Sequence, residues 1–424
     1  MGFAVRIRCD LCRSVLCFNV AVGYESGGKE DGGEIVQEDC ETEKMIEIPT
    51  KQDCCGCGAC SQICPRQCIE MKKDEEGFCY PRVDKEVCVN CGLCERTCPI
   101  LNVKRDGSGR TVRQDAYVAY HLDEKIRLES SSGGVFTALA EDVIQQGGIV
   151  FGAAFDHEYL VHHIGVENLS DLEKLRGSKY LQSRTEDTFR EAKAALDQGR
   201  RVLYSGTGCQ IAGLKAYLKQ DYANLLTVDI LCHGVPSPAL WTLYLAEMEK
   251  KHGGTVRRVS FREKNPGWKL FSLSLLFSND QAYINTFKED KYMQMFLKNI
   301  CLRPSCYQCK FKTISSQADI TLGDCWGIEK YMPEIDDDKG ISGIFVHSEN
   351  GESAVSRIAS SVYSQKADFQ RIQQTMVYES VTQHPHRKKF FKALAERKTA
   401  NQLFSLLTLT ITEKAARKIK KILK

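Results

Sequence analysis

The residues best suited to chemistry in this chain are its cysteines. Of the 21 cysteines in 424 residues, 11 fall between Cys54 and Cys98. Eight of them form two copies of a C-x2-C-x2-C-x3-C-P spacing: Cys54, Cys57, Cys60 and Cys64, then Cys88, Cys91, Cys94 and Cys98. Thiolates at this spacing wrap one face of an iron-sulfur cubane, and glycines such as Gly56, Gly58 and Gly92 leave backbone room near the sulfides. Zinc also binds paired cysteines, but a zinc site takes four ligands rather than two interlocked sets of three plus one.

The repeat predicts crossed ligation of two 4Fe-4S clusters, because in such double motifs the fourth cysteine binds the cluster of the other motif. The predicted ligands of one cluster are Cys54, Cys57, Cys60 and Cys98. The predicted ligands of the other are Cys88, Cys91, Cys94 and Cys64. Cys55, Cys68 and Cys79 fall outside the spacing and are expected to be buried thiols. The stretch 76–81 between the motifs is typical of the hairpin that joins the two halves of a ferredoxin.

An alternating pattern of strands and helices begins at Tyr117, which is typical of a parallel α/β fold. Predicted strands occupy residues 148–154, 201–204 and 225–231, with helices over 135–146 and 211–218. Residues 256–261 and 270–277 alternate with period two and predict antiparallel strands added to this body. The predicted fold class is therefore α/β, or α+β overall, in which a ferredoxin-like two-cluster domain precedes the α/β body.

Three glycine-bearing polar loops lie where open α/β sheets bind ligands. In the loop 130–134 a serine can cap the following helix and the helix amides can bind an anion, and a plain helix cap is the alternative. The second loop contains Thr207, Gly208, Cys209 and Gln210. The third contains Cys232 and His233, and His233 is the best candidate for a proton donor because imidazole titrates near neutral pH. A purely structural histidine is the alternative.

A third cysteine group follows the antiparallel strands. Cys301, Cys306 and Cys309 lie close together in the sequence. With Cys232 as a fourth ligand they could hold a further 4Fe-4S cluster. The alternative is a set of reduced cysteines packed beneath a cofactor.

Seven motifs in order resemble the beta subunit family of coenzyme F420-reducing hydrogenases and dehydrogenases. They are SSSGGV (130–135), RGSKYLQS (176–183), SGTGCQIAGL (205–214), DILCHGVPS (229–237), FREKNPGW (261–268), CYQCKF (306–311) and ADITLGDCWG (318–327). The resemblance extends from about Cys54 to about Gly351 and implies FAD and a flavin-binding α/β domain. The family usually has Pro where Gly208 stands and an aromatic residue where Cys325 stands. Some bacterial members come from organisms without F420, so the resemblance does not assign F420 as the substrate.

The resemblance also implies which residues bind the flavin. Ser131, Ser132, Gly133 and Gly134 would line the FAD, with Thr207, Gly208, Cys209 and Gln210 from the second loop. Lys179 and Gln182 would lie nearby as donors of charge and hydrogen bonds. Lys179 could stabilise negative charge on the reduced flavin, and an exposed lysine without contacts is the alternative. The predicted catalytic residues are His233, Cys232 and Lys179.

The predicted function is that of an iron-sulfur flavoprotein oxidoreductase of an anaerobe. It would move electrons between ferredoxin-type clusters and an FAD-linked substrate, either F420-like or another organic acceptor. Expected partners are a ferredoxin or a redox partner subunit, together with a small-molecule substrate. The alternative is a non-catalytic electron-transfer subunit of a larger redox complex.

Composition argues against other classes of protein. Lys and Arg number 58 against 55 Asp and Glu, a net charge of +3, so no nucleic-acid partner is expected. No apolar run approaches the roughly 20 residues of a membrane span, and charged residues interrupt the first 23 residues, so a cytoplasmic protein is expected.

Four regions are expected along the chain. They are a disordered or mispredicted leader at 1–44, the dicluster domain at 45–105, the flavin domain at 115–350 and a helical region at 351–424. The basic stretches 386–389 and 414–424 are expected to be solvated helix faces, with a docking patch for an acidic ferredoxin or a membrane surface as the alternative.

Overall fold

The computed structural model describes residues 45–102, 115–312, 316–374 and 379–409, together with two short strands near the N-terminus. The strands β1 (Ala4–Arg8) and β2 (Val15–Asn19) pair antiparallel. The rest of the leader predicted at 1–44 lies outside the described residues. Residues 43–424 form one compact unit, so the boundary expected near residue 105 separates two regions of one packed body.

The two cysteine motifs fold as two similar turns of helix. The elements of this region are η1 (Lys51–Asp53), α1 (Ala59–Ile63), β3 (Ile69–Lys73), β4 (Cys79–Val83) and α2 (Leu93–Thr97). Gly58 precedes α1 with φ +75° and Gly92 precedes α2 with φ +67°, a left-handed backbone that favours glycine. Between the motifs β3 and β4 pair antiparallel, as predicted, and Asp74 closes their turn by accepting hydrogen bonds from the amides of Glu76 and Phe78.

An eight-stranded mixed sheet forms the centre of the α/β body, with the order β15-β5-β14-β13-β9-β8-β6-β7. Its strands are β5 (Asp115–His121), β6 (Ile149–Phe155), β7 (Val161–Val166), β8 (Val202–Thr207), β9 (Leu225–Ile230), β13 (Ile320–Asp324), β14 (Ser342–Val346) and β15 (Val362–Ala367). The four central strands β13, β9, β8 and β6 are parallel, which confirms the predicted α/β centre. The strands on both flanks are antiparallel, so the fold is α+β overall.

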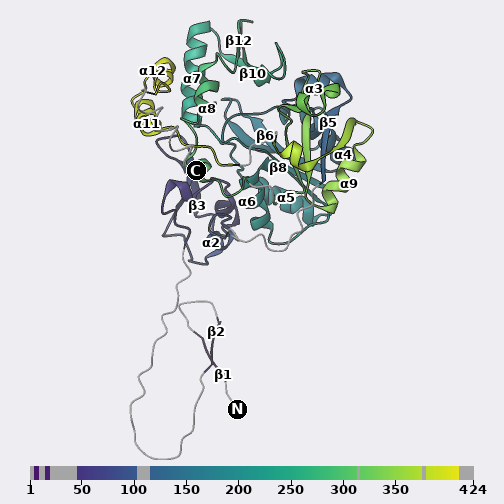
Figure 1. Ribbon diagram of the computed structural model, residues 1–424. Helices are drawn as coiled ribbons and strands as arrows, with labels where there is room; N and C mark the ends of the chain where they lie inside the picture. Colours follow the sequence, from purple (N-terminus) through teal and green to yellow (C-terminus); the bar gives the residue numbers. More distant parts are fainter. Residues whose placement is uncertain are drawn as a thin grey trace, which may run out of the picture. The chain divides into compact units, whose positions relative to one another are not determined.

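Helices cover both faces of this sheet (Figure 1). On one face α4 (Val135–Gln145) and α9 (Glu349–Arg357) pack against alternate strand residues such as Val150 and Leu203. On the other face α5 (Thr188–Asp197) and α6 (Gly208–Leu218) pack against their neighbours Phe151 and Tyr204. Cys57 belongs to this second core, so the first cysteine motif packs directly onto α5 and α6.

A second, three-stranded antiparallel sheet forms from β10 (Val256–Glu263), β11 (Ser272–Phe277) and β12 (Ala282–Thr286). The predicted antiparallel strands are present, and in the described chain they pair only with one another, so they form a separate sheet beside the α/β sheet. They pack on α7 (Pro238–His252) and α8 (Lys291–Leu297) through an aromatic core. In that core the ring of Trp241 lies 4.9 Å from the rings of both Phe261 and Tyr292.

The remaining elements are short. They are α3 (Glu124–Glu129), α10 (Phe369–Gln374), α11 (Arg387–Ala395), α12 (Ala400–Ser405), η2 (Leu172–Lys174), η3 (Pro304–Gln308), η4 (Ile328–Lys330) and η5 (Pro333–Ile335). The prediction of a wholly helical region from 351 is wrong, because β15 pairs with β5 at the edge of the main sheet. Half of the side chains of β15, Ser364 to Lys366, are exposed and polar, so the strand lacks the apolar alternation that marks a half-buried strand. Among the described residues no helix has the length and apolarity needed to cross a bilayer.

A buried ion pair attaches α11 to the β3–β4 turn. Arg387 donates to both carboxylate oxygens of Glu76, at 2.9 and 2.5 Å, and to the carbonyl of Leu302. Both charged side chains are buried, which corrects the expectation that the whole stretch 386–389 is a solvated face. The C-terminal helix therefore contacts the ferredoxin-like region directly.

Arg387→Met is expected to lower the free energy of unfolding by about 3–5 kcal/mol, because it leaves the Glu76 carboxylate buried without a counter-charge. Denaturant unfolding of the full chain measures this loss. The exposed neighbour provides the control, since Lys388→Met should change the stability by less than about 0.5 kcal/mol. The double variant Glu76→Gln/Arg387→Met should lose less free energy of unfolding than Arg387→Met alone. An equal loss of stability in Arg387→Met and Lys388→Met would contradict the stabilising role of the buried Arg387–Glu76 ion pair.

Candidate iron-sulfur and cofactor sites

The thiols of the first motif converge with the thiol of Cys98. Burial raises the pKa of Cys60, and the thiols of Cys54 and Cys98 raise it further. A hydrogen bond with Cys55 lowers the pKa of Cys57, but burial and the thiol of Cys60 leave it raised. Crowded thiols keep their protons unless a cation compensates their charge. These four predicted ligands therefore lie in one group that a cationic metal centre would stabilise.

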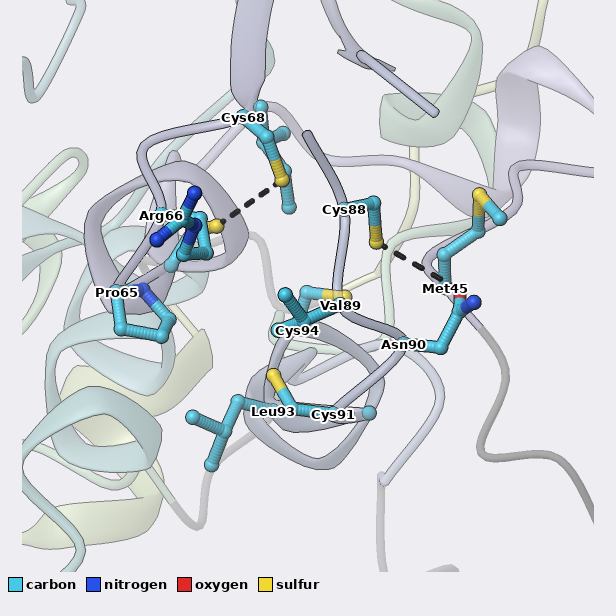
Figure 2. Close-up of a pocket in the computed structure, with 13 residues that line it drawn as sticks. Met45, Pro65, Arg66, Cys68, Cys88, Val89, Asn90, Cys91, Leu93 and Cys94 are labelled. Atoms are coloured by element: carbon cyan, nitrogen blue, oxygen red, sulfur yellow. Dashed lines mark hydrogen bonds between the residues drawn. The ribbon is translucent and has the colours of Figure 1, made fainter. Parts of the chain in front are cut away.

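The remaining four predicted ligands border one cavity, which also includes Cys68 (Figure 2). The ligands are Cys64, Cys88, Cys91 and Cys94. The amide of Ile46 donates a hydrogen bond to the sulfur of Cys94 at 3.3 Å. Cys68 is buried as expected, whereas Cys55 and Cys79 are only partly buried. The fold thus brings Cys64 to the second group and Cys98 to the first, the arrangement that crossed ligation requires.

The described residues contain no group of three or more metal-binding side chains placed around a single ion. That geometry would suit zinc, whose ligand atoms all lie about 2.0–2.3 Å from one centre. A 4Fe-4S cluster binds each of its four thiolates through a different iron, so its ligands are spread more widely.

A third group consists of Cys209, Cys232, Cys306 and Cys309. Burial raises the pKa of Cys232, and the three other thiols raise it further. Cys301, which was predicted to join this group, does not: it is fully buried in the apolar core beside Tyr292. Cys209 takes its place, because β8 and β9 are adjacent parallel strands whose carboxyl ends bring Cys209 and Cys232 together.

An unpaired lysine lies beside the third group. Lys312 Nζ is buried without a hydrogen-bond partner in the part of the chain that the structure describes. Burial lowers the pKa of Lys312, and the thiols of Cys232, Cys309 and Cys306 oppose this effect. A buried ammonium without a partner is costly, and an anionic cluster held by these thiolates would supply the missing counter-charge.

Arg303 joins the first motif to the α/β body. Its side chain is fully buried, Nε donates to the carbonyl of Cys54 at 2.8 Å, and Nη1 donates to Gln182 Oε1 at 2.8 Å. Nη2 lies 3.5 Å from the sulfur of Cys54 and donates to the carbonyl of Cys79 at 3.0 Å. The guanidinium also lies over the ring of Tyr80. Sequence reasoning missed this residue, because an arginine inside CLRPSC has no diagnostic spacing.

The loop 130–134 is held by hydrogen bonds within the protein. Ser131 Oγ accepts from the amide of Ser178 at 2.6 Å, and Ser132 Oγ donates to the carbonyl of Ile341 at 2.9 Å. The predicted serine cap of α4 is wrong, since its N-cap is Gly134, with φ +88° and no side-chain cap. The loop therefore leaves mainly the first-turn amides of α4 for a ligand.

Gly133 is required by packing. A Cβ at this position would lie 2.4 Å from the carbonyl oxygen of Ala119, and its amide donates to Ser342 Oγ at 2.9 Å. Substitution of Gly133 would therefore disturb the joint between α4 and the sheet whether or not a flavin binds there.

Lys179 and Gln182 face different neighbours. Lys179 Nζ donates to the carbonyls of Leu175, Arg176 and Gly177 at 3.1–3.3 Å, so the alternative of an exposed lysine without contacts is wrong. Burial lowers the pKa of Lys179 to about 7. Gln182 Nε2 instead donates to the carbonyl of Cys55, at the first cysteine motif.

The second loop forms the start of α6. The Thr207 amide donates to Gln210 Oε1 at 3.0 Å, and Gln210 Nε2 donates to the carbonyl of Ser183 at 3.1 Å. Gly208 lies close to other backbone, since a Cβ there would be 3.0 Å from the carbonyl oxygen of Phe311. Thr207 and Gln210 thus have structural roles, while Cys209 belongs to the third thiol group.

Two titratable side chains, His233 and Asp229, lie near the third thiol group. His233 Nε2 lies 2.6 Å from Asn299 Oδ1, and burial lowers its pKa, so the ring is neutral near pH 7. Asp229, which sequence reasoning did not select, accepts hydrogen bonds from Ser316 and Thr321, and burial raises its pKa to about 6. Asp229 therefore titrates much closer to neutral pH than an ordinary aspartate does.

A two-motif cysteine region packed on a mixed α/β sheet defines an iron-sulfur electron-transfer protein. Residues 53–101 match a 4Fe-4S dicluster domain. Residues 199–371 match the family described as the C terminus of the coenzyme F420 hydrogenase/dehydrogenase beta subunit. Over the residues matched, these two findings agree with the predicted resemblance, and the matched family is that of an oxidoreductase subunit.

Solved structures include a similar chain in the F420-reducing [NiFe] hydrogenase complex from Methanosarcina barkeri. That chain is 18% identical, and the similarity covers 68% of this chain and 89% of that chain with a TM-score of 0.42. A comparison with curated proteins found no match.

Crossed ligation predicts for which pairs of substitutions the losses of iron are additive. Cys98→Ser combined with Cys57→Ser should lose no more than the roughly four irons of one cluster, because both residues bind the same centre. Cys98→Ser combined with Cys91→Ser should lose about eight. Iron analysis after anaerobic reconstitution measures both, and Cys79→Ser is the control that should keep full iron. The reverse pattern of additivity would show that each motif binds its own fourth cysteine.

Arg303→Met is expected to make the reduction potential of the first cluster more negative by on the order of 60 mV, a tenfold change in the equilibrium for one electron. The reason is the loss of a positive charge beside the sulfur of Cys54. Redox titration followed by paramagnetic resonance measures the shift. Arg190→Met is the matched control, because Arg190 donates to the carbonyl of Gln62 in the same motif but already pairs with Asp187. An unchanged potential in Arg303→Met would contradict the electrostatic role.

Proposed function

We propose that this chain is an iron-sulfur flavoprotein oxidoreductase that moves electrons between ferredoxin-type clusters and an FAD-linked organic substrate. The observation that supports it most directly is the contact between the thiols of Cys55 and Cys209. Cys55 lies between two predicted ligands of the first cluster, and Cys209 belongs to the third thiol group at the end of β8. The third thiol group therefore contacts the first cysteine motif through Cys55, which is also hydrogen-bonded to the predicted ligand Cys57.

The proposal includes a third 4Fe-4S cluster. Its ligands would be Cys209, Cys232, Cys306 and Cys309. Lys312 supports this assignment, because its buried ammonium has no other described hydrogen-bond partner. Arg303 also lies near this group, since the thiol of Cys306 contributes to the raised pKa of Arg303.

The proposal also includes FAD near the start of α4. The first-turn amides of α4 suit a phosphate, and Ser131 links this loop to the segment that contains Lys179. FAD exchanges either one or two electrons, so it would couple clusters to an organic substrate. Lys179 would hold a proton at Nζ, since its pKa of about 7 lets it gain or lose that proton near neutral pH.

A cavity of about 200 Å³ lies against the first motif and is a candidate site for the organic substrate. Gly56 and Gly58 border it, together with Gln182 and Thr185 of the α/β body. Lys73 supplies positive charge at its wall, whereas Arg184 in the same wall pairs with Asp156 and Glu186. A substrate bound there would lie next to the first cluster, and an anionic group on it would find a counter-charge.

The second candidate function is a non-catalytic electron-transfer subunit of a larger redox complex. The observation that favours it is the matched family itself, which is described as a beta subunit. In that case the partner subunit would contribute the substrate site.

Cofactor analysis of the full chain tests the proposed function. After anaerobic reconstitution the protein should contain about twelve irons, from three 4Fe-4S clusters, and one FAD. The double variant Cys306→Ser/Cys309→Ser should contain about eight irons. The control Cys301→Ser should keep about twelve, because Cys301 lies outside the third group.

The outcomes separate the alternatives. About eight irons in the unaltered protein, unchanged in the double variant, would refute the third cluster. Full iron loading without flavin, even with FAD in excess, would refute the flavoprotein and favour the non-catalytic subunit.

A further inference from the structure

The two cysteine motifs are near copies, but they differ four residues after their fourth cysteine. Cys68 follows Cys64 at that distance, whereas Asn102 follows Cys98. Asn102 Nδ2 donates to the carbonyl of Cys98 at 2.9 Å and to two further carbonyls of the α2 turn. Asn102 therefore has a structural role at the end of its motif. The position of Cys68 suggests a different role, because its thiol points into the cavity of the second thiol group (Figure 2).

That cavity is bordered by five thiols, although a 4Fe-4S cluster needs four. The fifth, Cys68, has its sulfur 3.4 Å from the sulfur of Cys64. It also forms a hydrogen bond with the thiol of Cys88, a second predicted ligand. Cys64 and Cys68 are both 8% exposed, so neither faces solvent more than the other. Two sulfurs in contact at the same wall of a cavity can each reach an iron bound there.

The two cysteines are held by different elements. Cys64 ends α1, and its carbonyl accepts from the amide of Gln67. Cys68 precedes β3, and its carbonyl accepts from the amide of Asp84 at 2.8 Å. Because its backbone is fixed by the β3–β4 hairpin, Cys68 keeps its position when the side chain of Cys64 is removed.

We propose that Cys68 is a reserve ligand of the second cluster, able to bind the iron that Cys64 binds. This rests on the dicluster domain at residues 53–101. In the exchange the Cys68 thiol gives its proton to solvent and its sulfur bonds to the iron, while the Cys64 sulfur leaves and takes up a proton. No electron is transferred. Cys98 has no such reserve at the equivalent position, because Asn102 stands there and offers no thiolate.

The test compares four variants of the full chain after anaerobic reconstitution with iron and sulfide: Cys64→Ala, Cys68→Ala, Cys64→Ala/Cys68→Ala and Cys98→Ala. Cys98→Ala is the matched control, since Cys98 is the equivalent ligand in the other motif. Cys64→Ala and Cys68→Ala should each keep the full iron content of the unaltered chain. Cys98→Ala and the double variant should each lose iron from one cluster. Loss of one iron leaves an oxidised three-iron cluster with its paramagnetic signal, and loss of about four irons leaves no cluster at that site.

The same iron loss in Cys64→Ala as in the double variant would overturn the proposal, because Cys68 then gives no rescue. Iron loss in Cys68→Ala alone would also overturn it, since Cys68 would be an obligatory ligand rather than a reserve. Cys91→Ala separates these outcomes from a failure of the dicluster assignment. If Cys91→Ala loses no iron, the second cluster itself is absent. Circular dichroism of each variant confirms that iron loss does not reflect unfolding.

Discussion

The buried guanidinium of Arg303 is the contact on which the arrangement of the two regions depends. It binds backbone or side-chain atoms of Cys54, Cys79 and Gln182, and thus both cysteine motif and α/β body. Its described hydrogen-bond partners include no carboxylate. A buried positive charge is costly unless an anion compensates it, and the cysteines beside Arg303 are Cys54, Cys55 and Cys306. If Cys54 and Cys306 bind clusters as proposed, their thiolates would compensate this charge, and docking of the two regions would be coupled electrostatically to cluster binding.

The parts of the fold that sequence predicted well are those with strong local signals. The repeated spacing from Cys54 to Cys98 identified eight ligand candidates, and continuous apolar runs located β6, β8 and β9. The polar edge strand β15 gives no such signal. Its backbone hydrogen bonds to β5 hold it in the sheet, so its exposed side chains need not be apolar. The alternation in the sequence likewise indicated that β10 and β11 are antiparallel strands. It could not indicate that they form a sheet of their own, because that depends on tertiary packing.

The candidate site shows the same limit at the level of single residues. Proximity in sequence suggested Cys301 as a ligand, yet the end of β8 brings Cys209 to Cys232 instead. Gly133 and Gln210 were selected as flavin contacts, and the structure shows that they also hold helices in place. Arg303 and Lys312 could not be selected, because their importance comes from burial beside thiols that are distant in sequence.

Two segments that follow the β3–β4 turn in the chain bind Glu76 in that turn. Ser237 Oγ donates to the carbonyl of Glu76 at 2.5 Å, and Arg387 binds its carboxylate. During synthesis the cysteine motifs leave the ribosome about 300 residues before Arg387 does, roughly 15–60 s at ordinary elongation rates. For that interval the Glu76 carboxylate lacks the positive charge with which it pairs in the folded protein. The late position of Arg387 therefore means that the β3–β4 turn takes its final, buried form only after almost the whole chain has been made.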